Sequence, residues 1–197
     1  MVITATMVKE LRAQTGAGVL DCKKALEETN GDKEKAAELL RQKGLDAAAK
    51  KAARQTADGR VEAYVHPGNR LATLVEVNCE TDFVARTEEF QTLCHDLAMQ
   101  VAAASPRWVS REEIPAAELE AVKEGFRQEM AAEGKPAAIQ ERIMEGKLAK
   151  FYKENCLLEQ AFIKDESKTI QQLLVEMIAR VGENTVIRRF ARFQIGQ

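Results

Sequence analysis

The sequence lacks the features that mark membrane, secreted or metal-binding proteins. No uninterrupted apolar run approaches the roughly 20 residues of a membrane-spanning helix, and Met1 to Thr6 has neither the basic start nor the apolar stretch of a signal peptide. The cysteines lie far apart without a CxxC pair, and the chain has only 2 histidines. These absences predict a cytoplasmic protein with no metal site, no cofactor and no disulfide framework. The cysteines expected to be free and mostly buried thiols are Cys22, Cys79, Cys94 and Cys156.

An excess of positive charge is also missing. The 31 acidic residues outnumber the 29 lysines and arginines, so the field of the whole molecule does not attract a polyanion. Short basic runs are more often solvated faces or ion-pair partners than nucleic-acid sites. We therefore expect neither a membrane nor a direct nucleic-acid partner. The runs in question are Lys50, Lys51 and Arg54, and Arg188, Arg189 and Arg192.

The first part of the chain has the pattern of a small helical domain. Apolar residues at helical spacing are interrupted by Thr15–Gly18, Gly31 and Gly44, which predicts three short helices that end at these turns. The segment after Gly44 is rich in alanine and poor in large apolar residues, which favours a helical connector over a core helix. We predict a helical domain over 1–45 and a helical linker over 46–58.

After the linker, the period of the apolar pattern changes to two. Val61–Val65 and Leu71–Val77 alternate in this way, and Pro67–Asn69 between them has turn chemistry, which together predict a β-hairpin. Thr185–Ile195 is rich in β-branched and aromatic residues, as extended strands are. Because strands and helices are interleaved, we predict an α+β core over 59–197 with a small antiparallel sheet.

The core also carries signals of several helices. Thr87 can cap one helix, and Ser110 to Glu113 and Thr169 to Gln172 have capping-box spacing. Pro136 fits the first turn of a further helix, so we predict a helical hairpin over 115–152. The buried side of the helix after Thr87 is expected to consist of Phe90, Leu93, Cys94, Leu97 and Val101.

Two interpretations of Phe83 are open from the residues alone. Phe83 lies two helical turns before Phe90, so it could extend the same apolar stripe into the core. Polar residues from Arg86 to Glu89 interrupt the stripe, however, which favours an exposed loop at this point. In such a loop Asp82 and Phe83 offer a charge and an apolar wedge to a partner.

Several segments of the chain resemble translation elongation factor Ts. Glu76–Arg86, EVNCETDFVAR, is similar to the second signature of that family, and Leu11–Leu26, LRAQTGAGVLDCKKAL, is similar to the first. The likeness continues through Gly134–Pro136, Glu145–Leu148, Glu159–Phe162 and Gly182–Asn184, so it covers almost the whole chain.

The resemblance implies a guanine-nucleotide exchange factor of translation elongation, not an enzyme. Such a protein binds elongation factor Tu with GDP, disturbs the magnesium and phosphate site, promotes GDP release and allows GTP to rebind. It also implies a ubiquitin-associated-like fold for the N-terminal helices. The tip that enters the GTPase beside its nucleotide, with Phe83 as the wedge and Asp82 as its polar neighbour, consists of Thr81, Asp82, Phe83 and Val84.

The resemblance further implies a second contact and an oligomeric state. The N-terminal domain binds the same GTPase elsewhere, for which Arg12, Val19 and Leu20 are the candidates. Val19 and Leu20 stand where many relatives have two methionines, so they keep apolar area without the adaptable thioether. Compact members of the family act as homodimers, and a homodimer is therefore expected here.

Other classes of function have weaker support. A hydrolase based on Cys94 or Cys156 with His95 has no evident third orienting group, and the adjacent Cys94 and His95 diverge on a helix. The N-terminal helices alone could also serve as a generic protein-binding module.

Overall fold

The computed structural model describes residues 3–134 and 136–196 and has the predicted α+β fold. The prediction for Met1 to Thr6 therefore lies partly outside the described residues. The chain divides into two compact units. One consists of Met1–Glu62, Val75–His95 and Gln171–Arg188, and the other of Ala63–Leu74, Asp96–Ile170 and Arg189–Gln197.

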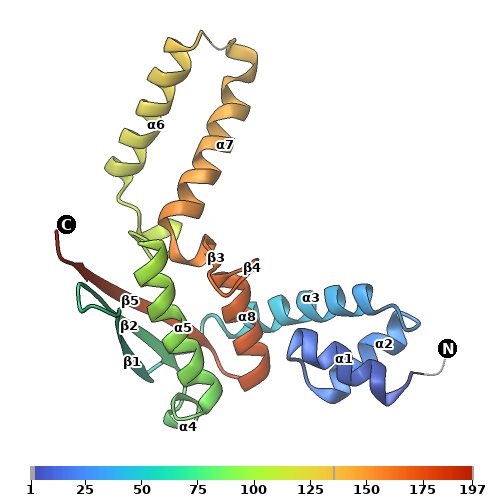
Figure 1. The fold of residues 1–197 in the computed structure, drawn as a ribbon. Helices are drawn as coiled ribbons and strands as arrows, with labels where there is room; N and C mark the ends of the chain where they lie inside the picture. Colours follow the sequence, from blue (N-terminus) through green and yellow to red (C-terminus); the bar gives the residue numbers. More distant parts are fainter. Residues whose placement is uncertain (1–2, 135, 197) are drawn as a thin grey trace. The chain divides into compact units, whose positions relative to one another are not determined.

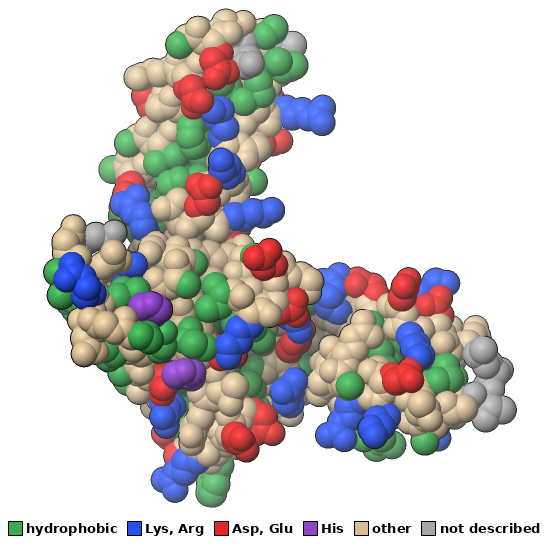
Figure 2. All heavy atoms as spheres, in the orientation of Figure 1, with side chains coloured by type: hydrophobic (Ala, Val, Ile, Leu, Met, Phe, Trp, Pro, Cys, Tyr) green, Lys and Arg blue, Asp and Glu red, His purple; other side chains and the backbone are tan. Residues whose placement is uncertain are grey.

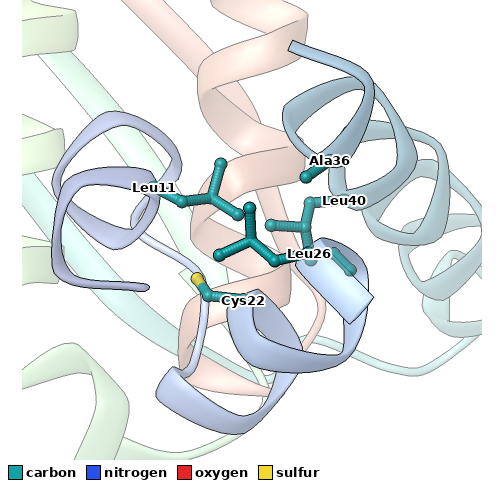
Figure 3. Packing of buried hydrophobic residues seen from close by; sticks show 6 residues of the cluster. Leu11, Cys22, Leu26, Ala36 and Leu40 are labelled. Carbon is teal, nitrogen blue, oxygen red and sulfur yellow. The ribbon is translucent and has the colours of Figure 1, made fainter. Parts of the chain in front are cut away.

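The first unit begins with the three predicted helices (Figure 1), which pack around a small core. They are α1 (Ala5–Thr15), α2 (Val19–Glu28) and α3 (Lys33–Lys51). Figure 3 shows their buried side chains pointing toward one another, with small residues allowing the helices to approach closely. The labelled members of this cluster are Leu11, Cys22, Leu26, Ala36 and Leu40.

Gly44 does not end the third helix, so that prediction was wrong. Helix α3 continues through Gly44 to Lys51. A Cβ atom at Gly44 would lie 3.4 Å from Val175 Cγ1 and 3.9 Å from Ala179 Cβ, both on α8 (Ile170–Val181). The glycine therefore permits a close approach between two helices instead of forming a C-cap. The domain limits expected from the sequence remain a prediction.

A three-stranded sheet with the order β1-β2-β5 contributes to both units. The predicted hairpin is confirmed as β1 (Asp58–Val65) and β2 (Leu71–Cys79), and the predicted last strand as β5 (Thr185–Gln194). Gly68 and Asn69 in the hairpin turn have positive φ angles of 93° and 55°. One face of β2 is buried through Thr73, Val75, Val77 and Cys79.

Two helices follow β2, namely α4 (Asp82–Ala85) and α5 (Glu88–Ala104). The hydroxyl of Thr87 accepts a hydrogen bond from the Phe90 backbone N–H at 3.3 Å, which confirms the predicted cap. The apolar stripe of α5 is also confirmed, because all its predicted members are buried. These are Phe90, Leu93, Cys94, Leu97 and Val101.

The second unit contains a helical hairpin, α6 (Ala116–Ala132) and α7 (Ala137–Asn155), whose helices pack against each other (Figure 1). Lys147 Nζ lies 2.7 Å from a carboxylate oxygen of Glu129 and 5.4 Å from the centre of the Phe126 ring. This lysine therefore joins the two helices by an ion pair and a cation–π contact.

The capping-box spacing at Ser110 does not open α6. The Glu113 carboxylate instead accepts a hydrogen bond from the Val109 N–H at 2.9 Å, and Ser110 makes no side-chain cap. Ile114 is extended, with φ −70° and ψ 121°, because a following proline disfavours the helical conformation. Helix α6 consequently begins only after Pro115.

The remaining strands form a small antiparallel pair, β3 (Ala161–Phe162) and β4 (Asp165–Thr169). Gln100 on α5 anchors this pair. Its buried amide donates to the Ala161 carbonyl at 3.1 Å and accepts from the Ile163 N–H at 2.9 Å.

All four cysteines are free and buried, as predicted. Among residues 3–134 and 136–196, no helix is both long enough and apolar enough to cross a membrane.

The close approach at Gly44 gives a stability prediction. Gly44→Leu is expected to lower the free energy of unfolding by about 1–3 kcal/mol, because the new side chain must displace Val175. Gly125 on α6 is the matched control, since a Cβ there meets nothing within 4 Å. Gly125→Leu should raise stability by up to about 1 kcal/mol. Denaturant unfolding measures both variants, and a stabilising Gly44→Leu would contradict this packing.

Candidate functional site

The predicted tip, Thr81–Val84, forms a single helical turn instead of the expected loop. Thr81 is the N-cap of α4, and its hydroxyl accepts a hydrogen bond from the Val84 N–H at 3.5 Å. Asp82 in the first turn forms an ion pair with Arg86 at 2.8 Å. The turn follows strand β2 with only two residues between them, so the sheet determines where it starts.

The tip has a buried side and an exposed side. Val84 and Ala85 are each 9% exposed, whereas Phe83 is 80% exposed. Phe83 is therefore not a core residue, and the first of its two interpretations was wrong. A phenyl ring on a capped turn is available to a partner.

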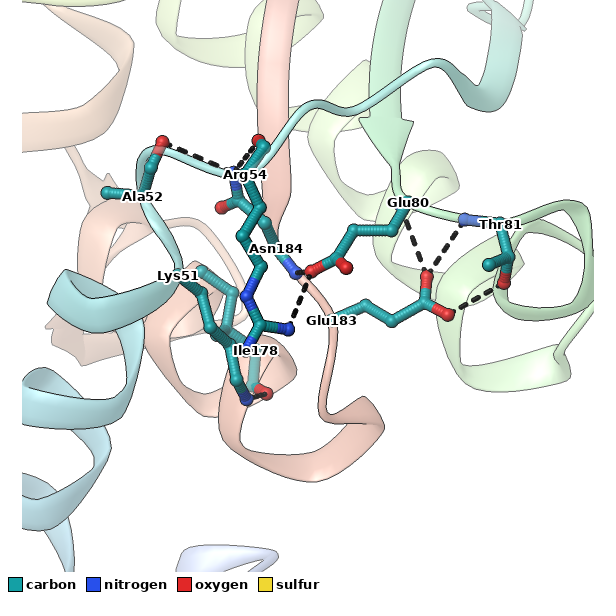
Figure 4. Close-up of polar contacts among 8 residues, drawn as sticks. All are labelled: Lys51, Ala52, Arg54, Glu80, Thr81, Ile178, Glu183 and Asn184. Carbon is teal, nitrogen blue, oxygen red and sulfur yellow. Dashed lines mark hydrogen bonds and ion pairs between the residues drawn. The ribbon is translucent and has the colours of Figure 1, made fainter.

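The Glu183 carboxylate, in the connection between α8 and β5, holds the start of the turn (Figure 4). One of its oxygens accepts the backbone N–H groups of Glu80 at 3.2 Å and Thr81 at 3.0 Å. The other accepts the Thr81 hydroxyl at 2.7 Å. Three donors from Glu80 and Thr81 thus converge on one carboxylate.

Asn184 connects Glu80, at the start of the turn, to the end of the N-terminal helices (Figure 4). Its backbone N–H donates to the Glu80 carboxylate at 2.6 Å, and its buried side-chain amide donates to the carbonyls of Arg54 at 3.0 Å and Ala52 at 3.5 Å. Arg54 also lies 3.4 Å from the Glu80 carboxylate. The Asn184 N–H, and then Arg54, hold the pKa of Glu80 below its usual value.

Cys79 supports the tip as a hydrogen-bond donor. Its thiol lies 3.1 Å from the Thr81 carbonyl. Burial, and then the negative charge of Glu183, raise the pKa of Cys79 to about 11. The thiol therefore keeps its proton at neutral pH.

Sequence reasoning missed Glu183 and Asn184 as parts of this site. Their partners lie about a hundred positions away along the chain, so no local period or spacing reveals the contact. The available signal was the Gly182–Asn184 segment, which belongs to the family resemblance.

The three N-terminal candidates lie on α1 and α2. Arg12 and Val19 line the same hollow, of about 410 Å³, with Val8 as a further apolar wall. Lys9 and Lys23 add positive charge to its lining. Leu20 does not line the hollow but is 72% exposed. This surface combines apolar area with positive charge, which suits a partner that presents apolar and acidic groups.

The cysteines are poorly suited to catalysis. Burial raises the pKa of Cys94 to about 12 and that of Cys156 to about 11, whereas a cysteine nucleophile needs a thiolate. His95 Nδ1 lies 3.2 Å from the Glu62 carboxylate.

The basic runs contribute to internal contacts. Lys51 Nζ donates to the Ile178 carbonyl at 3.3 Å, and Arg192 Nε donates to the Ala102 carbonyl at 3.3 Å. Arg54 pairs with Glu80, as described above. Basic and acidic side chains are interspersed over the face drawn in Figure 2, which does not resemble the basic stripe of a nucleic-acid binder.

The chain is similar to proteins of one family. Residues 5–197 match the model of a family described as elongation factor TS. A protein named elongation factor Ts from Caldanaerobacter subterraneus subsp. tengcongensis is 60% identical over 99% of this chain and 98% of its own length. Its namesake from Herpetosiphon aurantiacus is 57% identical over 100% of this chain and 99% of its own. One from Carboxydothermus hydrogenoformans is 58% identical over 99% and 90%, respectively.

The lowered pKa of Glu80 predicts a pH dependence. The stabilisation from this carboxylate is complete above its ordinary pKa of 4.5 and is lost as the pH falls through the lowered value. Glu80→Gln should therefore be less stable than the parent at about pH 7, and the difference should shrink toward about pH 3. Thermal unfolding across this range measures the difference. A gap that is constant or grows in acid would contradict the assigned contacts.

Proposed function

Because the chain belongs to the elongation factor Ts family, and is thus a translation elongation factor, we propose that it is a cytoplasmic guanine-nucleotide exchange factor. It binds elongation factor Tu with GDP and promotes GDP release by disturbing the magnesium and phosphate site, so that GTP can rebind. The observation that carries this proposal is the exposed Phe83 on a capped turn within the second family signature.

The tip acts by inserting Phe83 into the partner, with Thr81, Asp82 and Val84 shaping the turn around it. Burying a phenylalanine contributes about 1.5–3 kcal/mol, and each 1.4 kcal/mol is about tenfold in affinity. Phe83 alone therefore accounts for a roughly 10- to 100-fold weakening of nucleotide affinity. Linkage requires GDP to weaken binding of the factor by the same ratio, so the factor binds nucleotide-free elongation factor Tu best.

The N-terminal domain supplies the second contact. Arg12, Val19 and Leu20 hold the GTPase while the tip acts, and the hollow beside Arg12 and Val19 supports this role. Both contacts are binding events, so the exchange factor carries out no chemical reaction of its own.

A homodimer is part of the proposal, and the sheet supports it. On β1, Val61 and Val65 are exposed, whereas the Glu62 side chain between them is only 15% exposed. Leu74 on β2 and Phe193 on β5 are also exposed. A strand that exposes its apolar side is typical of a surface covered by a partner, and a second copy of the chain covers it in this proposal.

The role of Phe83 predicts a specific loss of exchange. Phe83→Ala should lower the acceleration of GDP release by about 10- to 100-fold, because the apolar wedge is removed. Release of fluorescent GDP from elongation factor Tu measures this. Ile139→Ala is the matched control, since it shortens another exposed apolar side chain on α7 and should leave release unchanged. Equal acceleration by the Phe83→Ala form and the parent would remove Phe83 from the mechanism.

The homodimer predicts a separate outcome. Phe193→Glu places a charge on the apolar sheet face and should convert the dimer into monomers, because burial of an unpaired carboxylate is unfavourable. Light scattering after size-exclusion chromatography measures the mass. Ile163→Glu, at another exposed apolar residue, should leave the dimer intact. A monomeric parent would disprove the dimer without affecting the exchange proposal.

A further inference from the structure

We propose that Glu183 is the positioning residue of the exchange tip, because its carboxylate determines the direction in which Phe83 leaves the surface. Glu183 is not itself a contact to the partner in this proposal. The inference rests on the proposed function of the tip, and it adds a residue that lies about a hundred positions from the tip in the sequence.

The bonds from Glu183 fix both the backbone and a side chain of the turn. The N–H groups of Glu80 and Thr81 share one carboxylate oxygen, at 3.2 and 3.0 Å, which orients the chain as it leaves β2. The Thr81 hydroxyl donates to the other oxygen at 2.7 Å. Hydrogen bonds to an ionised acceptor are stronger than those between neutral groups, so the carboxylate holds the start of the turn firmly.

The Thr81 hydroxyl transmits this restraint to the helical turn. The same oxygen that donates to Glu183 accepts the Val84 N–H. A chain of hydrogen bonds therefore runs from Glu183 through Thr81 to Val84, and Phe83 lies between the last two residues. Fixing the Thr81 rotamer fixes the cap, and the cap orients α4.

The other contacts of the tip restrain its direction less than Glu183 does. The Cys79 thiol, a weak donor, contacts only the Thr81 carbonyl. Helix α4 has only 4 residues, too few to be stable without outside support. The ion pair of Asp82 with Arg86 is solvent-exposed and lies within the turn, so it does not orient the turn relative to the sheet. Val84 and Ala85 anchor the inner side, but apolar burial is non-directional.

Asn184, the residue after Glu183, provides a matched comparison variant. Its side chain bonds to the carbonyls of Ala52 and Arg54, not to the tip. Asn184→Ala therefore removes buried hydrogen bonds while leaving the three bonds of Glu183 in place. The Asn184 variant therefore reports a loss of stability, and the Glu183 variant reports a loss of tip geometry.

The test measures GDP release from elongation factor Tu at increasing concentrations of the full chain, which gives a maximal rate and a half-saturating concentration. Glu183→Ala should lower the maximal rate about tenfold or more, with the half-saturating concentration within about threefold, because the N-terminal contact is unchanged. Asn184→Ala should keep the maximal rate within about threefold of the parent.

Two further variants separate positioning from a general structural role. Glu183→Gln should restore most of the rate, because its amide oxygen can accept both N–H groups and its NH₂ can donate to the Thr81 hydroxyl. In a Phe83→Ala background, Glu183→Ala should have no further effect, since it acts through Phe83. A parent-like rate for Glu183→Ala, no recovery with Glu183→Gln, or an equal loss in the Phe83→Ala background would each overturn the proposal.

A measurement on the chain alone distinguishes this proposal from the proposed function. Amide hydrogen exchange of Glu80 and Thr81, measured by NMR, should accelerate about tenfold or more in Glu183→Ala, while the Phe90 amide reports that the fold is intact. Unchanged exchange at Glu80 and Thr81 would overturn the positioning role. If the parent does not accelerate GDP release, the proposed function fails, and amide exchange still decides whether Glu183 holds the turn.

Discussion

The Glu183 carboxylate accepts two backbone N–H groups and one hydroxyl from the segment that joins β2 to α4. Without it, a turn of 4 residues would be ordered only by the Cys79 thiol, the exposed Asp82–Arg86 ion pair and the burial of Val84 and Ala85. Ordering a free backbone costs about 1–2 kcal/mol per residue. For the 4 residues of the turn this cost exceeds the roughly 1.5–3 kcal/mol that the burial of Phe83 contributes, so a disordered tip would lose the contribution of Phe83 to exchange. A turn that is ordered before binding keeps this energy for the partner.

Exposed apolar groups are otherwise unfavourable, and here they occur where a partner is proposed. Phe83 is exposed at the tip, Leu20 is exposed on α2, and Phe193 is exposed on the sheet. The elements that present them are held by polar contacts or buried cores, as Asn184 shows for the end of the N-terminal helices. The chain therefore combines rigid elements with apolar surfaces, which suits a protein that acts by binding.

Features with a local cause could be predicted from the sequence. The apolar period places Phe90 in the core, and turn chemistry places the β1–β2 hairpin. Gly44 was misread because a glycine that ends a helix and a glycine that admits a neighbouring helix look alike until Val175 is placed beside it. The same limit applies to Glu183. In the sequence, Glu183 looks like an ordinary surface residue. Its role depends on the sheet, which brings β5 beside β2. The role proposed for the tip comes from the family resemblance, because periodicity alone left it open.

In the proposed mechanism, the tip is already formed before it meets its partner. A crystal structure of the chain bound to nucleotide-free elongation factor Tu tests this most directly. The account predicts that Phe83 is buried against the GTPase, that Thr81 still donates to Glu183, and that the backbone from Glu80 to Arg86 moves by less than about 1 Å. A Phe83 side chain left in solvent, or bonds between Thr81 and Glu183 broken in the complex, would contradict it.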